Sequence, residues 1–237
     1  MKSQDKLKLI ILHGWGQEKS QWSIFADKIG QTISTEVFDL PGFGKEPINK
    51  NVKTVKEYAQ WTTKLIENKR GNHKVILMGH SFGGRIAAEI AVNNPSWLKS
   101  LILIAAPCIR IPSLKNQILG SLAKIASSVI PESKLKDKII IKFGSEDYIR
   151  ARNTELEEIF RAAIGYDQSH QLGKINIPTS LVWGESDTEV PVSIAKKMLT
   201  LIPDCKLTIL PDTGHNIHLE NPDLLYGKVR NLIQEQN

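Results

Sequence analysis

A short apolar run that ends in a glycine-rich turn constrains this chain more than any other stretch. Residues 75–78 read Val-Ile-Leu-Met and lead into G-H-S-F-G-G at 79–84, which an alanine-rich, helix-favouring segment follows at once. A strand, a sharp turn and a helix in this order form a nucleophile elbow, with Ser81 at its tip in a strained backbone conformation. Gly79 and Gly83 then leave space where a Cβ atom would collide. We therefore expect Ser81 to be presented at the positive end of the helix that follows it.

Apolar runs and helical patterns alternate along most of the chain. Apolar residues dominate both faces of the run 7–12, and other runs are almost continuously apolar, so these segments fit strands buried between two layers of helices. Such an alternation predicts an α/β fold with a mostly parallel sheet of about six strands. The expected strands cover residues 7–12, 33–38, 74–78, 101–105, 179–183 and 206–210. The expected helices cover 20–29 (capped by Ser20), 52–69, 82–93, a stretch that begins near 191, and 222–234.

This alternation breaks between residues 108 and 173, where helical patterns replace it. One apolar stripe spans 114–129 and another spans 156–163, whereas the β-branched run 139–141 also fits a strand. A block inserted after one strand of a parallel sheet lies over the carboxyl end of that sheet, where ligands bind. We therefore expect a helical cap insertion at 108–173 that roofs an apolar pocket. The core domain then consists of 1–107 and 174–237.

Catalysis by Ser81 requires two further groups. A serine hydroxyl is a poor nucleophile unless a base removes its proton, and that base needs a third group to fix its tautomer. His215 follows the last expected strand and Asp187 follows the strand before it, so both belong to the same sheet edge as Ser81. Glu185 and Asp212 are alternative candidates for the third group, because they lie in the same two loops.

Five short segments, in a fixed order along the chain, resemble segments of a known family. They are H-G-W-G at 13–16, D-L-P-G-F-G at 39–44, G-H-S-F-G-G at 79–84, W-G-E-S-D-T-E-V-P at 183–191 and G-H-N-I-H-L-E-N-P at 214–222. In these segments, and in its order of nucleophile, acid and base, the chain resembles the α/β-hydrolase superfamily. The resemblance is to the cap-bearing branch of small carboxylesterases and carbon–carbon bond hydrolases, and it covers nearly the whole chain outside 108–173.

The resemblance implies a role for each matching residue. Ser81 corresponds to the nucleophile, His215 to the base and Asp187 to the orienting acid. The backbone N–H groups of Trp15 and Phe82 correspond to the oxyanion-hole donors that bind the substrate carbonyl. Losing one such donor costs about 3–4 kcal/mol of transition-state stabilisation. The chemistry implied needs no cofactor and no metal.

The chain departs from the family pattern in two places. Few residues precede the strand at 7–12, so we expect the family's N-terminal hairpin to be absent and the strand at 33–38 to form a sheet edge. Arg85 follows the glycine pair of the elbow, as in lyases of menaquinone synthesis that share the fold and triad. An arginine in the first turn of a helix also fits a surface salt bridge, which is the interpretation we favour.

The remaining histidines have structural interpretations. His13 and His80 lie inside motifs and are expected to support loop geometry rather than to transfer protons. His218 is one helical turn past the proposed base and is expected to pack or hydrogen-bond locally, whereas His73 and His170 fit the surface.

Composition excludes several other classes of protein. The net charge is +6, but the lysines are scattered and no nucleic-acid motif is present, so nucleic acid is not an expected partner. Cys108 and Cys205 have no His or Cys at metal-binding spacing, and inert packing is expected for Cys108. No segment is long and apolar enough to span a membrane, and two lone thiols fit a reducing compartment. We therefore expect a cytoplasmic protein, monomeric or homodimeric.

These observations predict a serine hydrolase that cleaves carboxylic esters of small or medium acyl groups through an acyl-enzyme. A carbon–carbon bond hydrolase or a proton-abstracting lyase on the same fold is the alternative. A binding module that keeps the pocket without catalysis is a third hypothesis.

Overall fold

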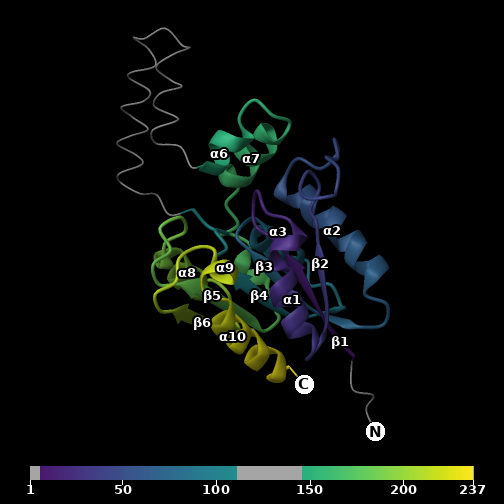
Figure 1. Ribbon diagram of the computed structural model, residues 1–237, viewed down its shortest axis with the longest axis vertical. Coiled ribbons are helices and arrows are strands. Elements are labelled where there is room, and N and C mark those ends of the chain that lie inside the picture. Colours follow the sequence, from purple (N-terminus) through teal and green to yellow (C-terminus); the bar gives the residue numbers. More distant parts are fainter. Residues whose placement is uncertain (1–5, 111–145, 237) are drawn as a thin grey trace.

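The computed structural model describes residues 6–110 and 146–236, and these form a six-stranded parallel sheet between two layers of helices (Figure 1). The strand order is β2-β1-β3-β4-β5-β6, and every adjacent pair runs parallel. The strands are β1 (Leu7–Leu12), β2 (Ser34–Phe38), β3 (Lys74–His80), β4 (Leu98–Ile104), β5 (Thr179–Gly184) and β6 (Cys205–Leu210). The predicted α/β class and parallel sheet are confirmed.

The burial of the strands explains their composition. The central strands β3 and β4 are buried almost throughout, because helices cover both of their faces. Strand β2 is less buried and forms one edge of the sheet, as predicted for 33–38. An ion pair between Lys8 Nζ and Glu36 Oε2, 2.6 Å apart, joins β2 to its neighbour β1.

The five main helices are α1 (Ser23–Gly30), α2 (Val55–Lys69), α3 (Phe82–Val92), α8 (Val192–Leu199) and α10 (Pro222–Gln234). Parallel strands are joined by right-handed crossovers, so the direction of each step along the sheet fixes the face its helix covers. Strand β2 lies on one side of β1, whereas β3 to β6 follow one another on the other side. The crossover from β1 to β2 therefore places α1 on one face of the sheet, and the later crossovers place α2, α3 and α8 on the opposite face. Helix α10 packs against α1. The strand order therefore reverses between β1 and β3, the position where open α/β sheets bind their ligands.

Three element boundaries differ from the sequence prediction. Ser20 does not cap a helix, because a 3-10 helix η1 (Lys19–Trp22) precedes α1 and Glu18 occupies its N-cap in a capping box with Gln21. Helix α2 begins later than predicted, at a capping box formed by Thr54 and Glu57. Strand β4 begins three residues before the predicted start, because Leu98 and Ser100 pair with β3 on either side of a register shift at Lys99. The short helix α9 (Ile217–Glu220) was not predicted.

The described part of the segment 108–173 contains helices and no strand. It comprises α6 (Glu146–Ala151), α7 (Leu156–Gly165) and the 3-10 helix η2 (Leu172–Lys174). Helix α7 buries Ile159, Phe160 and Ala163 of the predicted stripe, and its Phe160 ring lies 4.9 Å from the Trp15 ring in the loop after β1. Figure 1 shows α6 and α7 beyond the main body of the sheet. The stripe at 114–129 and the run 139–141 lie outside the described residues, and the division into core and cap domains stays a prediction.

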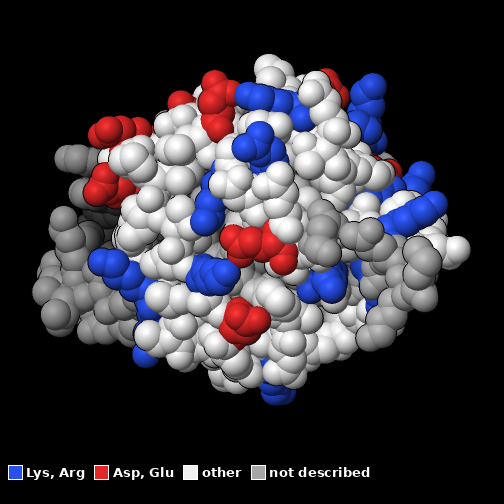
Figure 2. All heavy atoms as spheres, turned by 90° about the horizontal axis from the view of Figure 1, so that it is seen from below, with Lys and Arg blue, Asp and Glu red and all other residues white. Residues whose placement is uncertain are grey.

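The surface charges are dispersed. On the face shown in Figure 2, basic side chains of the described residues are spread over most of the view, and acidic side chains lie among them at the upper left, the top and the centre. This distribution fits the scattered lysines of the sequence. Within residues 6–110 and 146–236, no helix has the length and apolarity needed to cross a membrane.

Candidate active site

Ser81 lies in a strained turn between β3 and α3. It has a φ of +49°, which side-chain-bearing residues rarely adopt. The two glycines predicted to make room do so, because a Cβ on Gly79 would collide with the carbonyl of Gly83, and one on Gly83 with the carbonyl of Leu12. The Ser81 N–H donates to the carbonyl of Ile104 at 2.9 Å, which ties the turn to β4. The elbow geometry is therefore present.

Two backbone N–H groups near this turn have no acceptor among the described residues. The register of β1 and β3 pairs Leu12 with Gly79, so the loop after β1 emerges beside the elbow. In that region the N–H of Gly83 donates to the carbonyl of His13 at 3.1 Å. The N–H groups of Trp15 and Phe82, by contrast, donate to no other group within the described part of the chain. The oxyanion hole assigned to these two donors stays a prediction.

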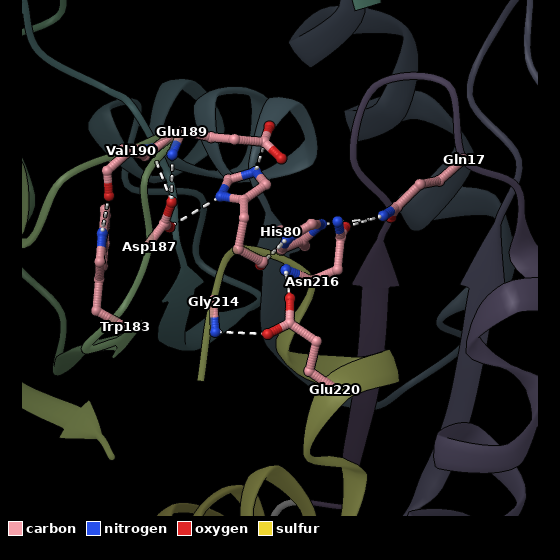
Figure 3. A network of polar contacts seen from close by, with 10 residues as sticks. Gln17, His80, Trp183, Asp187, Glu189, Val190, Gly214, Asn216 and Glu220 are labelled. Atoms are coloured by element: carbon pink, nitrogen blue, oxygen red, sulfur yellow. Dashed lines mark hydrogen bonds and ion pairs between the residues drawn. The ribbon is translucent and has the colours of Figure 1, made fainter. Parts of the chain in front are cut away.

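The structure brings His215 and Asp187 together. Nδ1 of His215 lies 2.9 Å from Oδ2 of Asp187, and both side chains are buried. The second oxygen of Asp187 accepts the backbone N–H groups of Glu189 (2.9 Å) and Val190 (2.7 Å), so the carboxylate is held in one orientation (Figure 3). The alternative acids, Glu185 and Asp212, are exposed and do not bond His215.

The surroundings of His215 act on its pKa in opposite directions. Burial lowers the pKa, but the hydrogen bond and charge of Asp187 raise it, and the net result is a pKa above the ordinary 6.5. Glu189 and Asp147 of α6 add to the rise through their charges, and Oε2 of Glu189 lies 3.9 Å from Nε2 of His215. The Asp187 carboxylate accepts a hydrogen bond from Nδ1, so Nδ1 carries the proton of the neutral imidazole. Nε2 then has a free lone pair and can act as a base.

His13 and His80 connect loops. His13 Nε2 accepts the N–H of Leu40 at 3.1 Å, and His80 Nε2 donates to the carbonyl of His215 at 3.0 Å. Burial lowers the pKa of both rings. These contacts agree with the structural roles predicted for the two histidines.

An aromatic group lies beside the elbow. The Trp15 ring contacts Phe43 at 5.0 Å, Phe82 at 5.2 Å and Phe160 at 4.9 Å between ring centroids, each edge to face. We call these four residues the Trp15 cluster. It joins the loops after β1 and β2 to the elbow helix and to α7, so helix α7 borders the candidate site.

Three other predictions have mixed outcomes. The surface salt bridge favoured for Arg85 is wrong, because Arg85 is 7% exposed and donates from Nη1 to the carbonyl of Tyr166 at 2.7 Å. Cys108 is fully buried, and burial raises the pKa of its thiol to about 12, as inert packing requires. His218 packs locally, stacked on Trp22 at 4.1 Å, but its two ring nitrogens have no hydrogen-bond partner among the described residues.

Sequence reasoning missed three residues near the site. Gln17 bonds the loop after β1 to the loop after β6, Glu189 lies beside His215 Nε2, and Glu220 accepts the N–H groups of Gly214 and Asn216. Glu189 and Glu220 lie inside the segments 183–191 and 214–222, which resemble the family. This position was the only feature of the sequence that could have indicated a role for them. The role of Gln17 depends on a partner 199 residues away.

Comparison with known families agrees with this geometry. Residues 9–227 match the sequence profile of the alpha/beta hydrolase family. The chain belongs to this family. The predicted superfamily is thereby confirmed.

Curated relatives of this alpha/beta hydrolase include enzymes named as esterases and hydrolases. It is 23% identical to the pimeloyl-[acyl-carrier protein] methyl ester esterase of Hamiltonella defensa, over 93% of this chain and 90% of that protein. It is 25% identical to the uncharacterized hydrolase YugF of Bacillus subtilis, over 95% of this chain and 89% of that protein. Among solved structures it resembles a membrane phospholipase A, with a TM-score of 0.76 and 23% identity over 99% of this chain and 80% of the other. This structural likeness supports the fold.

Proposed function

We propose that this alpha/beta hydrolase is a serine esterase that cleaves carboxylic esters of small or medium acyl groups. The observation that carries the proposal is the 2.9 Å contact between His215 Nδ1 and Asp187 Oδ2 at the sheet edge that bears the strained Ser81. The His80 ring, next to Ser81 in sequence, lies 5.0 Å from the His215 ring. The base loop and the elbow are therefore neighbours. The esterase named among the relatives supports ester cleavage.

In the proposed acylation step, Nε2 of His215 takes the proton of the Ser81 hydroxyl while Oγ bonds the ester carbonyl carbon. The N–H groups of Trp15 and Phe82 stabilise the negative charge that develops on the carbonyl oxygen. The bond to the alkoxy group then breaks, and the alcohol leaves with the proton from His215. Asp187 keeps the imidazole oriented and stabilises its charged form throughout.

In the proposed deacylation step, a water molecule replaces the alcohol. His215 takes a proton from this water as its oxygen bonds the acyl carbon of the ester on Ser81. The bond to Oγ breaks, Ser81 regains a proton from His215, and the carboxylic acid is released. Each cycle thus consumes one ester and one water and yields one acid and one alcohol.

A panel of p-nitrophenyl esters from acetate to octanoate tests the proposal. We expect the wild type to release p-nitrophenol and Ser81→Ala to release almost none, with both proteins giving the same circular dichroism spectrum. Equal release by the two proteins would contradict the assignment of Ser81. Inertness of the wild type toward every ester would favour the carbon–carbon hydrolase, lyase or binding-module hypotheses.

The lyase alternative depends on Arg85, for which the favoured surface salt bridge is wrong. In the structure Arg85 is buried and its Nη1 is occupied by the Tyr166 carbonyl. The ester hypothesis stands first because curated relatives are named as methyl ester esterases.

A further inference from the structure

We infer that Gln17 is a positioning residue that couples the oxyanion loop to the loop that carries the base. The inference rests on the proposed function for the meaning of these two loops. Gln17 directly follows the H-G-W-G segment and is 9% exposed. A buried amide is retained where its hydrogen bonds are made, because an unpaired buried polar group costs about 1–3 kcal/mol.

The partners of Gln17 fix the orientation of its amide. Oε1 accepts the backbone N–H of Gly14 at 2.9 Å and the indole N–H of Trp22 at 3.3 Å. Nε2 donates to Oδ1 of Asn216 at 3.0 Å, as Figure 3 shows. Because two donors face the oxygen and one acceptor faces the nitrogen, a flipped amide would lose its bonds.

The neighbouring His80 does not substitute for this link. Its Nε2 lies 3.0 Å from the carbonyl of His215, which can only accept, so Nε2 carries the proton. Burial holds the ring neutral, and Nδ1, 3.3 Å from Oε1 of Gln17, therefore has no proton to donate. His80 anchors the main chain of His215 and packs against Gly14, but of these two residues only Gln17 forms a hydrogen bond to the oxyanion loop.

Each end of the Gln17 link lies one residue from a proposed catalytic group. Gly14 precedes Trp15, whose N–H is a proposed oxyanion donor, and Asn216 follows His215. The packing at Gly14 is close, since a Cβ there would lie 2.7 Å from Nδ1 of His80 and 3.2 Å from Oε1 of Gln17. Loss of the amide would free both loops to shift relative to each other. Misplacement of catalytic groups by about 1 Å costs on the order of 100-fold in rate.

Steady-state kinetics with p-nitrophenyl butyrate tests the catalytic consequence. We expect Gln17→Met to lower kcat about 10- to 100-fold with KM changed less than about twofold, because positioning and not binding is lost. The control is Gln171→Met, since Gln171 is 7% exposed and bonds Glu89 and Tyr166 instead. This control should lower thermal stability and leave kcat unchanged. An unchanged kcat in Gln17→Met, or equal losses of kcat in both variants, would overturn the inference.

A double-mutant cycle tests whether Asn216 is the partner through which Gln17 acts. Asn216 is only half-buried, so Asn216→Ala should fold. We expect this variant to lower kcat, and we expect the double variant with Gln17→Met to lose no more than the worse single variant. Fully additive losses would show that the two residues act separately.

The chemical shift of a backbone amide tests the Gln17 link independently of the proposed function, because it is measured without ester turnover. Asn216→Ala should shift the Gly14 amide resonance in the wild-type background, through the loss of the Gln17 Nε2 bond. In the Gln17→Met background the same substitution should leave the Gly14 resonance unmoved. An unmoved Gly14 resonance in both backgrounds would refute the coupling, whereas a wild type without ester turnover would refute only the proposed esterase.

Discussion

His215 and Asp187 meet through a 2.9 Å contact between Nδ1 and Oδ2 although 28 residues separate them in the chain. The loops after β5 and β6 bring them together, because parallel strands end at the same edge of the sheet. Two backbone N–H groups occupy the other oxygen of Asp187, so its carboxylate cannot turn away from the imidazole. This contact is the basis of the predictions about catalysis.

Removal of the proposed catalytic side chains should abolish ester turnover. We expect Ser81→Ala and His215→Ala each to lower kcat by about 10⁴-fold or more, since they act as one unit. Asp187→Asn should cost somewhat less, because Nε2 of His215 remains present although its tautomer is disturbed. Initial rates with p-nitrophenyl butyrate measure the losses, and thermal melts check the fold. Turnover within about threefold of wild type in the serine variant would rule out this nucleophile.

The fall in kcat/KM at acidic pH, the acid limb of the pH profile, should follow the protonation of His215. The protonated ring cannot act as a base, so kcat/KM should fall as the pH drops through a pKa above 6.5. Glu189→Gln removes a carboxylate 3.9 Å from Nε2, which lowers that pKa and should move the limb to lower pH. The shift should be small, because the Glu189 side chain is 57% exposed and solvent screens its charge. A limb that moves to higher pH, or a flat profile down to pH 4, would contradict this role for His215.

Glu220 should position the loop that carries His215. Its carboxylate accepts the N–H of Gly214 at 2.5 Å and that of Asn216 at 2.9 Å, on either side of the base. We expect Glu220→Ala to lower kcat about 10-fold or more while KM stays nearly constant. Glu220→Gln keeps one acceptor oxygen and should lose less. The control is Glu235→Ala, because Glu235 is exposed and forms an ion pair with Lys206 instead of bonding the His215 loop. Equal effects of the two alanine variants on kcat would contradict the positioning role of Glu220.

His218 should make the fold sensitive to mild acid. Burial lowers its pKa from 6.5 to about 4, with help from nearby His215. The unfolded chain therefore binds a proton as the pH falls below 6.5, whereas the folded chain does not until about 4. The free energy of unfolding should decrease across this interval, and His218 should account for about 2 kcal/mol of the loss between pH 7 and pH 5.

Urea unfolding of His218→Phe at pH 7 and pH 5 measures that contribution. The variant should lose less stability on acidification than the wild type. At pH 7 it should be at least as stable, because it removes two buried nitrogens that have no hydrogen-bond partner in the described part of the chain. His170→Phe is the control, since it replaces a histidine that is exposed. An identical acid loss in wild type and His218→Phe would exclude this source.

Phe160 should influence which acyl chains are accepted. It belongs to the Trp15 cluster beside the elbow and comes from α7, within the predicted cap. Each methylene fitted to an apolar site contributes about 0.8 kcal/mol, or about fourfold in rate. We expect Phe160→Leu to change the ratio of hexanoate to acetate hydrolysis by at least that factor. Ile164→Ala on the same helix, at a residue 50% exposed, should leave the ratio unchanged. If both variants alter only the melting temperature, α7 has no part in selectivity.

Features set by neighbouring residues could be predicted from the sequence. The apolar runs gave the six strands, and the glycines of the elbow indicated the strained Ser81, because both depend on local sterics and burial. The chain order of Ser81, Asp187 and His215 was enough to expect the last two at one sheet edge. The structure then joined these two side chains.

Features that depend on distant parts of the chain could not be predicted. Arg85 looks like a surface residue of a first helical turn, but the segment that returns from α7 covers it and supplies the Tyr166 carbonyl. Ser20 is a good N-cap residue, yet Glu18 and Gln21 form the cap. Gln17 carried no signal at all, since its partner Asn216 is remote in sequence.

Covalent capture of the nucleophile tests the central claim most directly. Diethyl p-nitrophenyl phosphate transfers its phosphoryl group to an activated serine, releases p-nitrophenol and leaves a stable adduct. We predict about one equivalent of p-nitrophenol per chain, with the diethylphosphoryl mass on the peptide that contains Ser81 and no adduct in Ser81→Ala. An adduct on a different residue, or equal labelling of wild type and Ser81→Ala, would contradict the account.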